Sequence, residues 1–254
     1  MLILACDTSN RACSSCLWKD GTCIDSAFRN DGLTHSQTFM PQVHALMEKN
    51  HIEYETLDAL ACTVGPGSFT GIRIGVSAVK TMAMALEKPA VPVSSLEAMA
   101  YPLRDEDALV VPLIDCRNHR AWSAAYYHGE QVLSEVADDV DHIRENCISY
   151  RDTNLSGKKI LLVGNGAAMF LEGLSEEALA EYREGFDEIH PESMAAIAEK
   201  TLLSEDETTR NSAFAADALM PVYLARTQAE RTANEQGREQ VEVPIRYYST
   251  QDEK

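Results

Sequence analysis

Residues 61–86 read ACTVGPGSFTGIRIGVSAVKTMAMAL, in which an apolar run enters a glycine-rich turn and then a long helical pattern. The apolar residues 57–64 predict a buried strand. Ser68 or Thr70 can cap the helix that follows, and the free N–H groups of its first turn point into the loop. Glycine lets the backbone approach a ligand closely. This order of elements predicts an α/β fold with a candidate phosphate site at the loop.

The loop does not match the common phosphate-binding or nucleophile motifs. A Walker A sequence needs a lysine after its last glycine, but Gly71 is followed by isoleucine and arginine. Thr70 stands where a dinucleotide fingerprint has its third glycine, and Pro66 and Thr70 flank Ser68 where a nucleophile elbow has two glycines. A structural alternative stays open, because Gly71 and Gly75 share one helix face and allow a neighbouring element to pack closely.

The pattern around the loop occurs twice along the chain. Residues 1–6, 12–18 and 22–30 predict three strands joined by tight turns, and a helix follows them. A second apolar strand that ends in an aspartate turn begins near residue 108, and residues 121–129 predict the strand after it. The sequence therefore predicts an internal duplication of an α/β unit, with mixed sheets flanked by helices.

The duplication divides the chain into two predicted lobes. The first covers residues 1–104 and the second covers residues 105–204. Part of the helical segment 205–230 is expected to pack back on the first lobe. Residues 231–254 form a polar tail, in which VEVPIRYY is a further strand candidate.

The chain carries a formal net charge of −18, and the charge is unevenly distributed. Residues 1–100 contribute −3 and residues 101–254 contribute −15. A surface this acidic repels nucleic acid unless a partner supplies the basic groove, and it also promotes solubility. The sequence contains no run of 18 apolar residues and no basic segment before its first apolar run, so we expect no membrane span, no signal peptide and a cytoplasmic location.

Seven cysteines are scattered along the chain, and their odd number does not suggest a disulfide framework. Cys13 and Cys16 form a CxxC pair within a predicted strand. Residues three apart in a strand face opposite ways, so the pair is not expected to share a metal ion or a disulfide. No HExxH motif or Cys/His zinc spacing occurs.

Asp7 and Asp115 each follow an apolar strand in the two repeated units. Carboxylates in such positions can hold a metal-bound phosphate, and they can equally cap a turn. The candidate nucleotide or phosphate site combines these two turns with the two glycine loops. Its residues are Asp7, Thr8, Ser9, Gly65, Gly67, Ser68, Thr70, Asp115, Gly164 and Gly166.

Taken together, these segments resemble the TsaB family, also called YeaZ, of tRNA threonylcarbamoyladenosine (t6A) synthesis. The resemblance implies the actin-like, Hsp70-like ATPase (ASKHA) fold of two duplicated α/β lobes. It extends over residues 1–226, and GPGSFTGIRIG is its most specific part. The matching segments are ILACDTSNRACS (3–14), LDALACTVGPGSFTGIRIGVSAVKTMAMAL (57–86), VPVSSLEAMA (91–100), PLIDCRNHRAW (112–122), VGNGA (163–167) and PVYLAR (221–226).

The chain departs from the related catalytic subunit, TsaD, at a metal-binding motif. TsaD proteins carry Val-Asn-His-Leu-Glu-Gly-His, and residues 93–99 of this chain read VSSLEAM. Ser95 and Met99 therefore stand where the two histidines would be. A hydroxyl and a thioether do not replace two imidazoles as ligands of a divalent ion. The resemblance implies a chain with no metal site and no transferase centre of its own.

The family resemblance also implies partners. TsaB proteins pair with a TsaD-type transferase that modifies adenosine 37 of tRNAs reading ANN codons, and a TsaE-type ATPase joins the complex. We expect pairing through helices 33–50 and 70–86, a homodimer when the partner is absent, and only indirect contact with tRNA. No cofactor is expected to be required, although weak ATP or ADP binding is compatible with the fold. The candidate interface residues are His35, Met40, Val43, Met47, Gly71, Arg73, Gly75, Ala78 and Met82.

Two other functions compete with this scaffold or activator role. A nucleotide-dependent ATPase or kinase of the same fold would use Asp7, Asp115 and the two glycine loops around a nucleotide. It predicts metal-dependent ATP turnover by the isolated chain. A peptidase is the third hypothesis, but the sequence offers no defensible Ser/His/Asp, Cys/His or HExxH arrangement.

Overall fold

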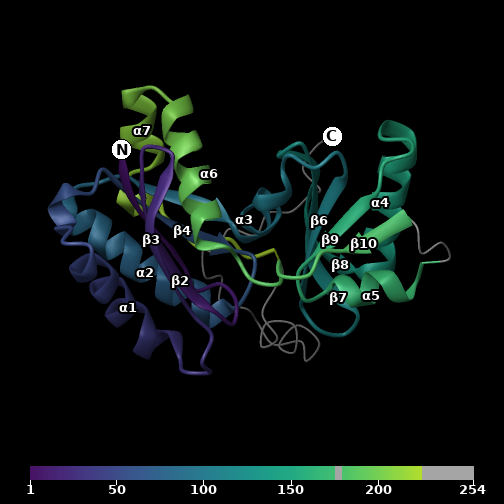
Figure 1. Cartoon of the computed structure of the whole chain (residues 1–254), viewed down its shortest axis with the longest axis horizontal. Helices are drawn as coiled ribbons and strands as arrows, with labels where there is room; N and C mark the ends of the chain where they lie inside the picture. Colours follow the sequence, from purple (N-terminus) through teal and green to yellow (C-terminus); the bar gives the residue numbers. More distant parts are fainter. Residues whose placement is uncertain (175–178, 225–254) are drawn as a thin grey trace, which may run out of the picture.

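The computed structural model describes residues 1–174 and 179–224, so the predicted polar tail and its strand candidate lie outside the described residues. Two lobes lie side by side, each built on a five-stranded sheet (Figure 1). The duplicated α/β arrangement with mixed sheets and flanking helices is confirmed.

The first lobe contains the predicted meander and the parallel strands that follow it. Its sheet has the order β3-β2-β1-β4-β5, in which β1, β2 and β3 are antiparallel neighbours and β4 and β5 run parallel to β1. The strands are β1 (Leu2–Asp7), β2 (Cys13–Lys19), β3 (Thr22–Arg29), β4 (Ala59–Gly65) and β5 (Ala90–Ser94). Every residue of β4 is buried, as expected for a central strand covered on both faces.

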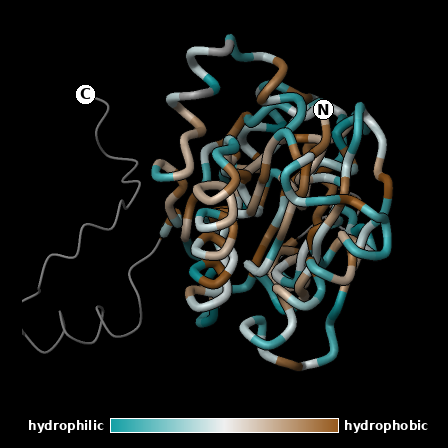
Figure 2. The backbone as a smooth tube through the Cα atoms, turned by 90° about the vertical axis from the view of Figure 1, so that its left-hand side faces the viewer, coloured by the Kyte–Doolittle hydropathy of each residue, from teal (hydrophilic) through white to brown (hydrophobic). Residues whose placement is uncertain are grey.

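Two long helices cover one face of this sheet (Figure 1). They are α1 (His35–Lys49) and α2 (Phe69–Leu86). Alternate residues of β1 divide between two cores, because Leu4 and Cys6 pack with these helices while Ile3 and Ala5 face the opposite side. Pro41 lies inside α1, which continues through it as one helix. Figure 2 shows hydrophobic segments gathered inside this lobe and hydrophilic ones in its outer loops.

The second lobe repeats the topology of the first. Its sheet has the order β8-β7-β6-β9-β10, and β6 is antiparallel to β7 and parallel to β9. The long strand β8 and the helix α4 were not predicted. The elements are β6 (Leu109–Asp115), β7 (Arg120–Tyr127), β8 (Glu130–Asp139), α4 (Val140–Asn154), β9 (Ile160–Val163), α5 (Ala167–Glu172) and β10 (Ala180–Tyr182).

The boundary predicted at residue 204 requires a correction, because the last helix of the expected second lobe belongs to the first. Helix α6 (Pro191–Ser204) packs on β1, β2 and β5 of the first sheet. The indole nitrogen Nε1 of Trp18 in β2 donates to the Glu199 carboxylate at 2.8 Å. An amphipathic helical pattern does not by itself indicate which of two similar sheets a helix covers, so the sequence placed these residues with the second lobe. The first lobe is therefore built from both ends of the described chain.

Short helices complete the fold. The segment after α6 packs back on the first lobe, as predicted: the backbone N–H of Ala90 donates to Phe214 at 2.8 Å, and that of Val222 donates to Val64 at 2.8 Å. Helix α3 lies between the two lobes (Figure 1). The short elements are η1 (Tyr54–Thr56), α3 (Ser95–Ala100), η2 (Tyr101–Leu103), α7 (Glu207–Ala213) and η4 (Ala216–Ala218).

Within the described residues, α2 is the one helix whose length and mean hydropathy of 1.2 would allow it to cross a membrane. The same helix packs on β4, and Ile72, Val76 and Val79 lie in the core of the first lobe. The Nζ atom of Lys80 donates to the backbone oxygen of Asp217 at 2.7 Å. These contacts are those of a helix packed against a sheet.

Candidate functional site

The glycine loop packs directly on the turn that follows β1. The hydroxyl of Thr8 donates to the Gly71 carbonyl at 2.7 Å, and the backbone N–H of Ser68 donates to the Ser9 carbonyl at 2.7 Å. The Ser68 hydroxyl caps α2 by accepting from the Gly71 N–H at 3.2 Å, as predicted. The structure thus brings the two candidate segments 7–9 and 65–71 together, and it joins them through their own polar groups.

The glycines of this loop are required by contacts within the chain. A Cβ atom on Gly71 would lie 2.0 Å from the Thr8 carbonyl oxygen, and one on Gly75 would lie 2.4 Å from the Thr8 hydroxyl. A Cβ atom on Gly67, whose φ is +156°, would lie 2.3 Å from the Ser9 carbonyl oxygen. The close-packing interpretation of Gly71 and Gly75 is therefore confirmed, and the approaching element is the turn after β1.

Asp7 is buried beneath this turn. Its Oδ1 atom accepts hydrogen bonds from the Ser9 N–H at 2.8 Å, the Ser9 hydroxyl at 2.6 Å and the Thr63 hydroxyl at 2.5 Å. Burial raises the pKa of Asp7, while these hydrogen bonds act in the opposite direction. An enclosed carboxylate that accepts two hydrogen bonds from its own turn and a third from Thr63 of β4 has the geometry of a turn cap.

The raised pKa of Asp7 predicts a measurable pH dependence. A group that holds its proton more tightly in the folded chain stabilises the fold as pH falls through the window between the raised pKa and the ordinary value of 3.8. Asp7→Asn removes the titration with little change in shape. As the pH is lowered from about 7 to about 4, the wild type should gain stability relative to the variant. The difference between their free energies of unfolding should grow by about 1.4 kcal/mol for each unit of pKa shift. Urea unfolding of both proteins measures this difference, and a constant or falling difference would contradict the assignment.

The second-lobe residues of the candidate site, Asp115 and the loop 164–166, also contact one another. The Asp115 N–H donates to the Asn165 side chain at 2.8 Å, and the Gly166 N–H donates to the Leu113 carbonyl at 2.9 Å. A Cβ atom on Gly164 would lie 2.4 Å from the Leu113 carbonyl oxygen. Asp115 itself is exposed, and its carboxylate accepts from the Arg117 N–H at 2.7 Å. Asn165 was missed as a member of this loop, although it lies between the two predicted glycines.

Ser95 and Met99 are enclosed within the protein. Their side chains are 0% and 1% exposed, and both lie on α3. Met99 belongs to the core cluster that also contains Ile3 and Val163, and its sulfur lies 2.8 Å from where a Cβ atom on Gly164 would stand. The two positions that would carry metal-binding histidines are thus part of the packing between the lobes.

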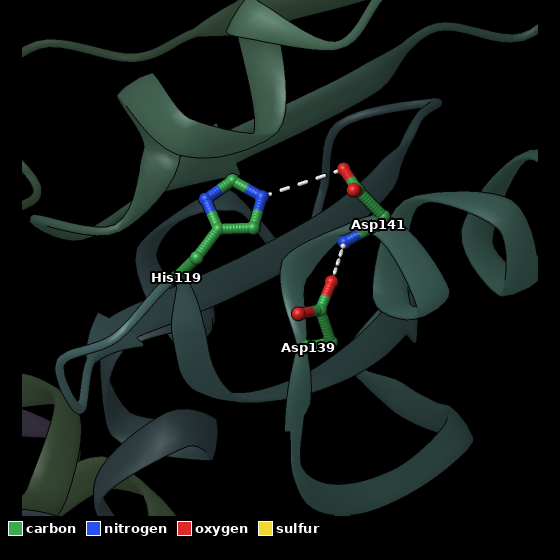
Figure 3. Close-up of side chains that lie close together, drawn as sticks. All are labelled: His119, Asp139 and Asp141. Atoms are coloured by element: carbon green, nitrogen blue, oxygen red, sulfur yellow. Dashed lines mark hydrogen bonds and ion pairs between the residues drawn. The ribbon is translucent and has the colours of Figure 1, made fainter.

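Three other side chains, near the start of α4, lie close enough together to be considered as metal ligands. Ligand atoms of His119, Asp139 and Asp141 lie within 4.8 Å of one another (Figure 3). Asp139 caps the helix by accepting from the Asp141 N–H at 2.9 Å, and His119 Nε2 lies 3.4 Å from Asp141 Oδ1. That same oxygen accepts from Arg144 at 2.6 Å, and this contact lowers the pKa of Asp141. The Asp141 carboxylate already has Arg144 as a cationic partner and Asp139 already caps the helix, so the cluster is better explained as a helix cap.

The predicted interface residues divide between the core and the surface. Val43 and Met47 are 0% and 1% exposed and contribute to the first-lobe core, and Gly71 and Gly75 are covered by Thr8. Their own chain therefore occupies the contacts that a partner would need. The other members remain accessible, together with Leu33 and Met84, which were not included. Met40 and Arg73 are exposed, and His35, Ala78 and Met82 are partly exposed.

The structure adds an aromatic group next to Arg73. The guanidinium lies 3.7 Å from the centre of the Phe69 ring, and its Nε donates to the Tyr223 hydroxyl at 2.8 Å. The two rings are 4.7 Å apart. Tyr223 belongs to the PVYLAR segment noted in the sequence. Its contact with Arg73, 150 positions earlier, could not be predicted from local sequence spacing. This group holds the end of the described chain against the start of α2.

Comparison with known proteins gives consistent relationships. A family model described as TsaD, tRNA N6-adenosine threonylcarbamoyltransferase, matches residues 32–233. The chain is similar to the tRNA threonylcarbamoyladenosine biosynthesis proteins TsaB of Bacillus subtilis (36% identity over 139 residues, 55% of this chain and 61% of the relative) and Escherichia coli (33% over 158 residues, 59% and 68%). The match thus spans less than two thirds of the first relative's length.

Solved structures give the same relationship over more of the chain. YeaZ from Pseudomonas aeruginosa superposes with a TM-score of 0.69 and 27% identity, covering 88% of this chain and 99% of that one. A second P. aeruginosa structure, described as similar to peptidase YeaZ, has a TM-score of 0.74 and 26% identity over the same shares. The similarity therefore extends through both lobes.

Proposed function

Because this chain belongs to the TsaB family, whose members are named for tRNA threonylcarbamoyladenosine biosynthesis, we propose that it is the non-catalytic partner of a TsaD-type transferase. In this role it activates the transferase by binding to it, and the transferase carries out threonylcarbamoylation of adenosine 37 in ANN-decoding tRNAs. A TsaE-type ATPase is the further proposed member of the complex. We place this activity in the cytoplasm.

The observation that carries the proposal is the apolar outer surface of α1 and α2. Met40 is 40% exposed and Met84 is 58% exposed, while Ala78 and Met82 lie partly exposed on the same pair of packed helices. We name this surface, with Leu33, the α1–α2 surface. Exposed apolar side chains on a pair of packed helices favour a protein partner. The same surface could join two copies of this chain when the partner is absent.

The interior of the protein supports a role without catalysis. The metal-motif positions Ser95 and Met99 are closed within the core, and the polar groups of the glycine loop are paired with the turn after β1. We therefore expect nucleotide binding weaker than about 1 mM and no metal-dependent ATP turnover by the isolated chain. The competing ATPase hypothesis predicts turnover that Asp7→Ala abolishes.

The charge distribution supports indirect contact with tRNA. Most of the net negative charge lies in residues 101–254, and phosphates would be repelled there. We propose that the transferase supplies the basic surface. The proposal predicts no measurable tRNA binding by this chain alone at physiological salt.

Size-exclusion chromatography with light scattering tests the central claim. The chain is run alone and mixed with the TsaD-type protein of the same organism. A one-to-one complex that forms at the expense of a homodimer is the expected result. If the two proteins elute separately under conditions in which the modification reaction proceeds, the partner role is excluded. Metal-dependent ATP turnover by the isolated chain would then favour the ATPase hypothesis.

A further inference from the structure

Two cysteine sulfurs lie close together between β2 and β3. The Sγ atoms of Cys16 and Cys23 are 3.5 Å apart. A register shift after Leu17 places Cys23 opposite Trp18, so that Cys16 and Cys23 lie on the same face of the sheet. Cys13, the other member of the CxxC pair, packs in the core on the opposite face. The structure therefore separates the two cysteines of the CxxC sequence and brings Cys16 beside Cys23 on the neighbouring strand.

The two thiols differ in accessibility. Cys16 is completely buried, whereas Cys23 is only partly buried and lies beside α6. The Cys23 thiol contacts the Glu192 carboxylate at 3.8 Å, and the same oxygen accepts from the Ser26 hydroxyl at 3.1 Å. Burial raises the pKa of Cys23, and the negative charge of Glu192 raises it further. A small oxidant can therefore reach Cys23 first, while Glu192 restrains its ionisation.

We propose that Cys16 and Cys23 form a hydroperoxide-sensitive thiol pair that closes into a disulfide, with Cys23 as the attacking sulfur and Glu192 as a restraint on its reactivity. The Cys23 thiolate attacks one peroxide oxygen, the O–O bond breaks, and Cys23 becomes a sulfenic acid as hydroxide leaves. The Cys16 sulfur then attacks the sulfenic sulfur, and the S–O bond breaks with loss of water. Overall, two thiols and one hydrogen peroxide give one disulfide and two waters.

The proposed bond requires a small movement. A disulfide holds its sulfurs about 2.0 Å apart, so the two atoms must approach by about 1.5 Å. Rotation of the partly exposed Cys23 side chain is the available motion, since Cys16 is held in the core. The bond would fix the edge strand β3 to β2 beneath α6. It would leave the α1–α2 surface, on the other face of the sheet, accessible.

Mass spectrometry of the folded chain tests the proposal. After treatment with hydrogen peroxide, the protein should be about 2 Da lighter than its reduced form, and after blocking of the remaining thiols it should carry two fewer blocking groups than the blocked, reduced protein. Proteolysis without reduction should yield a peptide linked through Cys16 and Cys23. The variants Cys16→Ser and Cys23→Ser should each lose this linkage, and Cys147→Ala, at a buried thiol in the other lobe, should retain it. Accumulation of Cys23 sulfinic acid without the linked peptide in the wild type would overturn the proposal.

The variant Glu192→Gln tests the restraint assigned to Glu192. Glutamine keeps an oxygen that can accept from Cys23 and Ser26 but removes the negative charge. Disulfide formation at neutral pH should become at least about twofold faster, because the Cys23 thiolate is no longer disfavoured by a neighbouring carboxylate. Glu199→Gln, on the same helix beside Trp18, is the matched control and should not change the rate. An unchanged or slower rate in Glu192→Gln would overturn Glu192 as a restraint on the reactivity of the pair.

Discussion

Gly71→Ala is expected to destabilise the chain by about 3 kcal/mol, the upper range for forcing an extra carbon into a packed site. The new Cβ atom would lie 2.0 Å from the Thr8 carbonyl oxygen, a backbone atom that cannot rotate away. Relieving this clash must separate α2 from the turn after β1, which also weakens the hydrogen bond from Thr8 to Gly71. A lowering of the melting temperature by roughly 10 °C is the expected thermal result.

The sign of this effect distinguishes packing from helix propensity. Alanine normally stabilises a helix interior relative to glycine by about 1 kcal/mol, so propensity alone predicts a gain. Ser77→Ala, at an exposed position of the same helix, serves as the control and should change stability by less than about 0.5 kcal/mol. Thermal unfolding of the three proteins provides the comparison. A Gly71→Ala variant as stable as the wild type would show that α2 does not depend on contact with Thr8.

The double variant Met40→Glu/Met84→Glu is expected to weaken binding to the TsaD-type partner by at least about 100-fold, equivalent to about 3 kcal/mol. Both side chains lie on the α1–α2 surface and are 40% and 58% exposed, so the substitutions disturb little of the core. Two carboxylates brought into an apolar interface would lose hydration without gaining partners. Isothermal titration calorimetry against the transferase measures the loss, and thermal unfolding checks that the fold is retained.

Leu203→Glu provides the matched control for this experiment. Leu203 is 64% exposed on α6, which covers the opposite face of the same sheet. The substitution is of the same kind but lies away from the α1–α2 surface, so binding should remain within about twofold of the wild type. If Leu203→Glu weakens binding and the double variant does not, the partner surface lies on α6 and our assignment is wrong.

The glycine loop illustrates what could be predicted from the sequence. The order of strand, turn and helix fixed the local structure, and the spacing of Gly71 and Gly75 identified a face that allows close approach. The sequence could not identify the approaching element, because Thr8 is more than 60 residues away and the contact uses its backbone. The same glycines are compatible with a bound phosphate or with a packed turn, and only the paired Ser9 and Gly71 carbonyls distinguish the two.

Periodicity alone could not separate core from surface on α1. Val43 and Met47 recur at helical spacing together with Met40, yet the first two are buried and the third is exposed. The spacing predicts that apolar residues lie near one face, but a helix with a broad apolar face can turn part of it outward.

The α4 sequence, VDHIRENCISYRDTN, posed the opposite problem. Val140, Ile143 and Cys147 are its only buried apolar residues, too few to produce a clear periodic signal.

The placement of α6 has a consequence for the order in which the protein is made. The second lobe is a continuous stretch from β6 to β10, but the first lobe needs α6 and the segment up to Tyr223 to cover its sheet. A chain emerging from the ribosome can therefore enclose the later lobe's core while the earlier sheet still exposes one apolar face. The half that is synthesised first is completed last, and during that interval it is the part that needs protection from aggregation.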